Sequence, residues 1–129
     1  MLDTNICVFA IKKQPNVLSA IKTHKSSGLC ISAITLSELQ HGVYNSYYPE
    51  KNNIALTNFL TLINVLPYDE NAAREYGKLK ATLQKNGCLI GNMGMLIAAH
   101  AKSVNIMLVT NNTSEFKRIY GLNIVDWTI

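Results

Sequence analysis

Three polar side chains in this sequence stand after segments that we expect to be strands. Asp3 follows the apolar pair at the start of the chain, Glu38 lies shortly after the apolar run 29–31, and Asn112 follows the run 106–109. Ligands of an open α/β sheet bind outside the carboxyl ends of its strands, so a parallel sheet can gather all three at one edge. Clustered oxygen ligands suit Mg²⁺ or Mn²⁺, and beside a basic surface they suit metal-assisted hydrolysis of phosphodiesters.

Both carboxylates also have a purely structural interpretation. Asp3 can serve as a turn or cap residue, and Thr4 and Asn5 can cap the helix that follows. Thr35 and Glu38 have the spacing of a capping box, in which the carboxylate folds back onto the start of its own helix. Spacing alone leaves the catalytic and the structural interpretation open.

The elements that must position these residues alternate between strand and helix. Short apolar runs bounded by turn residues predict strands, and apolar residues at intervals of three and four predict helices. The first predicted strand ends at residue 3, and the others span 29–31, 65–68, 106–109 and 122–125. The predicted helices span 4–13, 16–25, 35–43, 49–63, 70–86, 91–101 and 115–116. This alternation predicts an α/β fold, a central parallel sheet with helices on both faces. We expect a single domain over residues 1–129.

The composition is that of an ordinary soluble protein. Apolar residues make up 48% and charged residues 16% of the 129 residues. No apolar run approaches the roughly 20 residues that a membrane span needs, and no signal peptide is visible. We therefore expect a cytoplasmic protein with no membrane partner. The formal net charge of +4 favours a nucleic acid or an acidic peptide as partner, although a solvated basic surface explains it equally well.

The cysteine, histidine and tyrosine patterns indicate structural roles. Three cysteines without C-x-x-C spacing, and histidines that do not pair with them at ligand spacing, argue against a zinc site. His100 lies in a strongly apolar predicted helix, and we interpret it, like His41, as a packed histidine. The cluster of Tyr44, Tyr47 and Tyr48 favours core packing or a loop anchor over a contact surface.

Four sequence blocks run from one end of the chain to the other. They comprise residues 1–5; residues 31–42; residues 90–93 with 96–101; and residues 108–112 with 115–116 and the ending 125–127. In this order they resemble the PIN-domain ribonucleases, specifically the VapC toxins of bacterial toxin–antitoxin pairs. Each block alone is weak, but the four together are highly specific.

The resemblance implies a PIN fold whose acidic pocket holds Mg²⁺ or Mn²⁺, and an endoribonuclease that cuts structured RNA such as tRNA. By position it implies that Asp3 and Glu38 are the metal carboxylates and that Asn112 occupies the fourth polar place, with Thr110 hydrogen-bonded beside it. It also implies a homodimer neutralised by a VapB-type antitoxin, whose C-terminal segment covers the pocket. Operator DNA would be bound only through that complex.

One position departs from the family pattern. Gly94, three residues after Gly91 and two before Leu96, stands where the motif has its third acidic residue. Glycine offers no metal ligand, which leaves Asp3 and Glu38 to bind the ion alone. Because losing one member of a catalytic unit can be as damaging as losing all of them, we expect weak metal binding and an impaired nuclease.

Two other classes of function are alternatives to the ribonuclease. Gly94 makes a non-catalytic module a real alternative, namely a dimer that binds its antitoxin and acts with it in autoregulation at operator DNA. A phosphate-binding receiver or flavodoxin-like domain is disfavoured, because no glycine-rich phosphate loop follows any predicted strand.

Overall fold

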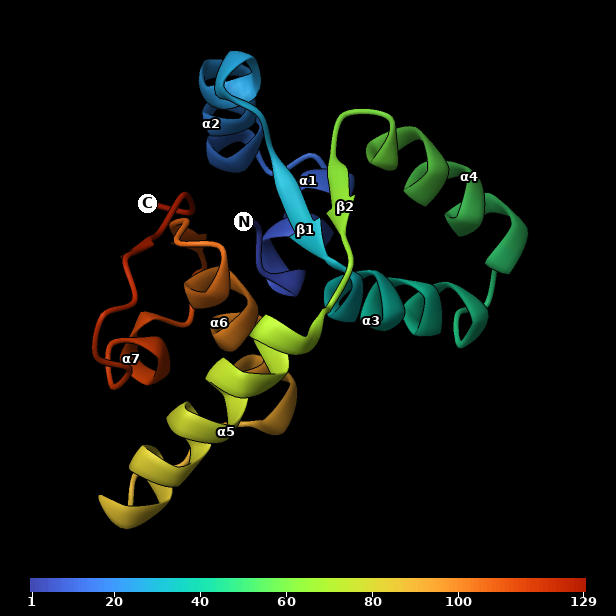
Figure 1. Ribbon diagram of the computed structural model, residues 1–129. Helices are drawn as coiled ribbons and strands as arrows, with labels where there is room; N and C mark the ends of the chain where they lie inside the picture. Colours follow the sequence, from blue (N-terminus) through green and yellow to red (C-terminus); the bar gives the residue numbers. More distant parts are fainter.

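The computed structural model describes residues 1–129 and contains two pairs of parallel strands, of which Figure 1 labels the first, β1 and β2. Strand β1 (Cys30–Ser32) pairs with β2 (Asn64–Leu66), and β3 (Leu108–Val109) pairs with β4 (Ile124–Val125). All four strands lie within the segments expected to be extended or within one or two residues of them. The prediction for β1 has the right length and is displaced by one residue, whereas the other three predicted strands were longer than the paired backbone.

The first residues of the chain connect the two pairs. The backbone N–H of Leu2 donates to the carbonyl of Cys30 at 2.8 Å, and the N–H of Asp3 donates to the carbonyl of Val109 at 2.9 Å. Leu2 and Val109 also form a parallel bridge. The strands therefore follow the order β2, β1, residues 1–3, β3, β4, which confirms the predicted parallel sheet and places Asp3 at its centre.

Seven α-helices and one short 3-10 helix complete the fold. They are α1 (Thr4–Ile11), α2 (Pro15–His24), η1 (Lys25–Ser27), α3 (Ala33–Tyr44), α4 (Pro49–Leu60), α5 (Glu70–Lys85), α6 (Asn92–Ser103) and α7 (Thr113–Phe116). None of these helices has both the length and the apolar character needed to cross a membrane. The long α5 packs against α6, and Figure 1 shows the two helices side by side with α7 beyond α6.

Side chains of the central strands point alternately into two hydrophobic cores. Leu2, Ile31 and Val109 pack with buried residues of α1 to α4 in one core. Met1 and Leu108 pack with buried residues of α5, α6 and α7 in the other. Successive side chains of a strand face opposite sides of the sheet, so a helical layer covers each face, as predicted.

Helix α3 begins earlier than the sequence suggested, and the capping-box interpretation of Glu38 is wrong. The helix starts at Ala33, directly after β1, and its cap is Ser32, whose Oγ accepts a hydrogen bond from the N–H of Ile34 at 3.1 Å. Thr35 is already inside the helix and is buried. Because β1 passes into α3 without a loop, the first helical turn lies at the sheet edge and Glu38 is free to contact another element.

The tyrosine cluster was also interpreted incorrectly. Tyr44, Tyr47 and Tyr48 are 77%, 96% and 71% exposed, at the end of α3 and in the connection to α4. Core packing of these rings is excluded. Spacing could not reveal this, because Tyr44 lies on the exposed end of α3, and Tyr47 and Tyr48 lie in the exposed connection before Pro49.

Candidate active site

Asp3 ends the central extended segment and caps helix α1. Its Oδ1 accepts a hydrogen bond from the N–H of Thr4, and its Oδ2 accepts one from the hydroxyl of Thr110, both at 2.8 Å. The residue is only 7% exposed. Burial raises the pKa of the Asp3 carboxyl, the hydrogen bonds from Thr110 and Thr4 partly offset that rise, and the nearby charge of Glu38 adds to it. The cap interpretation of Asp3 is therefore correct, but the same carboxylate also faces a second acid.

Glu38 reaches the same place from α3. Its Oε1 accepts a hydrogen bond of 2.5 Å from the hydroxyl of Thr4, and that hydroxyl lies 3.4 Å from Oγ1 of Thr35. Thr4 thus bonds to Asp3 through its main chain and to Glu38 through its side chain. Two carboxylates from elements far apart in the sequence are brought together around one threonine.

Asn112 lies just after β3, next to Thr110. Its backbone N–H donates to the hydroxyl of Thr110 at 3.0 Å, and its side-chain amide donates to Oε2 of Glu115 at 2.6 Å. Thr110 therefore accepts from Asn112 while it donates to Asp3, so one chain of hydrogen bonds links the end of β3 to the start of α1. Thr110 is fully buried, which holds this chain in place.

Gly94 faces the same region from the first turn of α6. A Cβ atom added there would lie 3.3 Å from Cζ of Phe116 and 3.7 Å from Cδ1 of Ile90. The Phe116 ring, which is 2% exposed, therefore occupies the space next to this position. Any larger residue at position 94 requires that ring to move by a few tenths of an ångström.

A cavity of about 170 Å³ joins all four predicted site residues. Its lining consists of Asp3, Thr4, Asn5, Glu38, Gly91, Met93, Gly94, Ile97, Asn112, Glu115 and Phe116. Glu115 is the acidic residue of this lining that was not predicted as a site residue, and the polar residues Thr4 and Asn5 were predicted only as helix caps. A signal for Glu115 existed: it stands three residues after Asn112, on the same face of a helical turn.

His100 does not line this cavity. It is 1% exposed, its Nδ1 lies 2.7 Å from Oγ of Ser32, and its ring meets that of Tyr68 edge to face. The packed interpretation of His100 is confirmed. His41, in contrast, is exposed on α3, so the same interpretation was wrong for that residue.

The side chains around the cavity fit a hard cation that keeps much of its water. Asp3 and Glu38 offer carboxylate oxygens at the edge of the sheet, which is the chemistry of Mg²⁺ and Mn²⁺ sites. No three histidine, cysteine or acidic side chains are grouped closely enough to hold one ion together. Mg²⁺ is often held by one or two carboxylates plus water and substrate phosphate, so the pair is sufficient for a weak site.

Comparison with known proteins decides the family. The model of the PIN domain matches residues 1–122. The chain belongs to the PIN-domain family. Its four predicted site residues all lie within the matched region.

Individual relatives within this family are also similar over nearly the whole chain. The tRNA(fMet)-specific endonuclease VapC of Shigella flexneri is 41% identical over 128 residues, which is 99% of this chain and 97% of the relative. The crystal structure of VapBC2 from Rickettsia felis, bound to a DNA fragment from their promoter, matches with a TM-score of 0.94 and 40% identity, covering 98% of this chain and 97% of that one.

DNA-bound VapBC from Salmonella typhimurium matches with the same TM-score of 0.94 and 41% identity, covering 98% of this chain and 96% of that one. These matches confirm the resemblance to VapC proteins and the predicted PIN fold.

Proposed function

We propose that residues 1–129 form one catalytic domain, a divalent-metal-dependent endoribonuclease toxin of a VapBC-type pair that cleaves structured RNA such as tRNA. The observation that carries this proposal is the junction of Asp3 and Glu38 around Thr4, in a cavity at the carboxyl edge of a parallel sheet. The ribonuclease names of the relatives support the reaction class. The basic net charge of +4 is compatible with an RNA substrate.

In this proposal Asp3 and Glu38 hold Mg²⁺ or Mn²⁺. When bound, such an ion supplies charge stabilisation at the phosphoryl group and lowers the pKa of water. The protein's own part is orientation: Thr4 holds both carboxylates and Thr110 holds Asp3 from the other side. Asn112 is a further polar side chain that can contact a phosphate oxygen, once its amide leaves Glu115.

We further propose that Gly94 impairs this activity. Asp3 and Glu38 neutralise one divalent ion, but they leave no third carboxylate to hold the ion and orient a water molecule at the same time. Glu115 does not fill that role as placed, because its carboxylate is bonded to Asn112 and the three acids do not form a metal-binding group. Loss of one member of a catalytic unit typically removes most of its activity.

The proposed partners follow from the relatives. The similar structures from Rickettsia felis and Salmonella typhimurium are VapBC complexes bound to DNA. We propose that this chain forms a homodimer in the cytoplasm, binds a VapB-type antitoxin that neutralises it, and meets operator DNA only through that complex. The alternative function is a non-catalytic module with the same partners, and the absence of a side chain at Gly94 favours it.

Restoration of the carboxylate tests the proposal. The Gly94→Asp variant should cleave RNA in the presence of Mg²⁺ or Mn²⁺, lose this activity in EDTA, and arrest growth on expression. The Gly94→Asn variant is the matched control, since it displaces the Phe116 ring equally but adds no charge. Its cleavage rate should stay near that of the unaltered chain.

Each result has a defined meaning. If Gly94→Asp is folded but cuts no RNA with either metal, the ribonuclease proposal fails, and co-purification of the chain with a small antitoxin would then support the binding module. If the unaltered chain already cleaves RNA as fast as Gly94→Asp, the ribonuclease stands and the impairment by Gly94 is wrong.

A further inference from the structure

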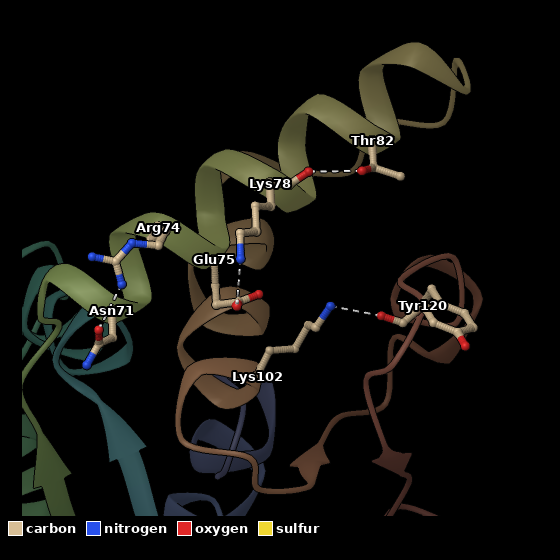
Figure 2. A network of polar contacts seen from close by, with 7 residues as sticks. All are labelled: Asn71, Arg74, Glu75, Lys78, Thr82, Lys102 and Tyr120. Atoms are coloured by element: carbon tan, nitrogen blue, oxygen red, sulfur yellow. Dashed lines mark hydrogen bonds and ion pairs between the residues drawn. The ribbon is translucent and has the colours of Figure 1, made fainter.

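A second polar cleft of about 240 Å³ lies between α5 and the segment that follows α7. Three cationic side chains line it, namely Lys78 of α5, Lys102 of α6 and Arg118, together with a single carboxylate, Glu75. Figure 2 shows the Lys102 side chain between the Glu75–Lys78 pair on one side and Tyr120 on the other. We call this feature the basic cleft; it shares no lining residue with the cavity around Asp3.

Lys102 is the most firmly placed cation of the basic cleft. Its Nζ donates to the carbonyl of Tyr120 at 2.9 Å, and it lies 3.7 Å from where a Cβ of Gly121 would be. An ammonium group has three donors, and no carboxylate lies within ion-pair distance of this one. Its charge and two of its donors are therefore available to an anion.

The other two cations are also poorly neutralised. Lys78 pairs with Glu75 at 3.9 Å, and its side chain is 68% exposed, so the pair is weak. Arg118 donates one bond of 3.3 Å to the carbonyl of Leu89 and keeps most of its fork of donors free. The basic cleft therefore carries a formal surplus of two positive charges.

The basic cleft begins close to the catalytic cavity. Phe116 and Gly91 both line that cavity. Arg118 lies two residues after Phe116, and its hydrogen-bond partner Leu89 lies two residues before Gly91. Along α6, Lys102 lies eight residues beyond Gly94, which is about 12 Å at 1.5 Å per residue. A segment of RNA a few nucleotides long can span such a distance, so one RNA strand can contact both the basic cleft and the catalytic cavity.

Tyr120 indicates which polyanion fits. Its ring is 94% exposed at the edge of the basic cleft, while its carbonyl holds Lys102. Free cations beside an exposed aromatic ring are the combination with which proteins bind unpaired nucleotides, through phosphate contacts and base stacking. An acidic peptide would use the same charges but has no need of the ring.

We propose that the basic cleft binds the sugar–phosphate backbone of the RNA substrate a few nucleotides from the bond that is cut, with Tyr120 stacking on a nearby base. This rests on the proposed ribonuclease function and adds a second contact site to it. Lys102 and Arg118 increase the affinity for RNA and fix its position along the protein. The chemical step takes place in the cavity around Asp3.

The test is the salt dependence of binding to a tRNA, measured in EDTA so that no cleavage occurs. The Lys102→Gln/Arg118→Gln double variant should bind about tenfold more weakly, and the slope of log affinity against log salt should fall by about two. The Lys22→Gln/Lys25→Gln variant removes the same charge from exposed positions on α2 and η1, and it should retain the original slope. Tyr120→Ala should weaken binding without changing the slope.

Further variants separate a lost charge from a damaged fold. The Lys102→Arg/Arg118→Lys exchange keeps both charges and should bind RNA as the unaltered chain does; if it binds as weakly as the glutamine variant, the basic cleft is only structural. Equal losses for the cleft and control variants would mean a general charge effect, and would overturn the proposal. Retained RNA binding with lost antitoxin binding would make the basic cleft a protein site instead.

The proposed ribonuclease can fail separately. If the unaltered chain binds no RNA and the Gly94→Asp variant cuts none, both proposals fall. If it binds RNA and the cleft variants match it, only the basic cleft is wrong. In the Gly94→Asp background, the cleft variants should raise KM and leave kcat at saturating RNA unchanged.

Discussion

The hydroxyl of Thr4 donates a 2.5 Å hydrogen bond to Oε1 of Glu38, although the two residues are 34 positions apart in the sequence. Through its backbone N–H the same threonine donates to Asp3 at 2.8 Å. One residue therefore connects α1 and α3 at the edge where both predicted metal carboxylates lie.

Removal of that hydroxyl should reduce both catalysis and stability. In the Gly94→Asp background, we expect Thr4→Val to lower kcat by about tenfold to a hundredfold, because small displacements of catalytic groups have effects of this size. The free energy of unfolding should fall by about 1.5–3 kcal/mol, the typical contribution of a hydrogen bond to a charged group. Thr4→Ser keeps the hydroxyl and should retain most of the activity. Steady-state kinetics and denaturant unfolding check this, and undiminished activity of Thr4→Val would contradict it.

The hydrogen bond between the side chains of Asn112 and Glu115 is a second contact at the cavity that a single substitution can remove. Asn112→Asp replaces the 2.6 Å hydrogen bond to Glu115 by two opposed carboxylates, so we expect a loss of about 1–3 kcal/mol of stability in EDTA. Added Mg²⁺ should raise the melting temperature of this variant more than that of the unaltered chain, since a ligand that binds only the folded state stabilises it. The neighbouring Asn111 is exposed, and Asn111→Asp should show neither effect. Identical melting of the two variants, with and without Mg²⁺, would refute the expectation.

His100 should make the stability of the fold depend on pH. Burial lowers its pKa from the ordinary value of 6.5, and the charge of Asp69 only partly offsets this. The unfolded chain therefore takes up the proton first, so the free energy of unfolding is highest above about pH 6.5 and decreases as the pH falls from there toward the lowered folded pKa.

Two histidine variants isolate this contribution. His100→Gln should lose about 1–3 kcal/mol at pH 8, where the buried partner Ser32 is left without the ring, and should show less decrease between pH 7 and pH 5 than the unaltered chain. His41→Gln alters an exposed residue of α3 and should follow the unaltered chain at every pH. Urea unfolding at several pH values measures both; an undiminished pH slope in His100→Gln would assign the effect to other groups.

Ser32 is expected to be the most important serine for the start of α3. It caps the helix through Ile34 and bonds to His100 at 2.7 Å, so Ser32→Ala should destabilise the fold by about 1–3 kcal/mol. Ser37 lies on the same helix and bonds only to the carbonyl of Ala33 at 3.1 Å. Ser37→Ala should therefore change stability by less than about 0.5 kcal/mol. A comparison of the two by thermal unfolding checks the reassigned helix start, and equal values would argue against it.

Local patterns in the chain were sufficient for most of the architecture. The alternation of short apolar runs with helical periodicity predicts the parallel sheet and its two helical layers, because burial and backbone pairing act on each segment separately. Helix α5 illustrates this. Asp69 caps its start, because Oδ1 accepts a hydrogen bond of 3.0 Å from the N–H of Ala72, and Gly87 follows its end with a φ of 66°. The position of Asp3 was predictable for the same reason, as it ends a strand and begins a helix.

Contacts between distant segments required the tertiary structure. The partner of the Thr4 hydroxyl and the ring of Phe116 beside Gly94 both depend on how closely separate elements approach. The basic cleft is of the same kind, since Lys78, Lys102 and Arg118 come from three different parts of the chain. Hydrogen bonds and charges act over a few ångströms in space, and spacing along a sequence does not specify which side chains come within that range.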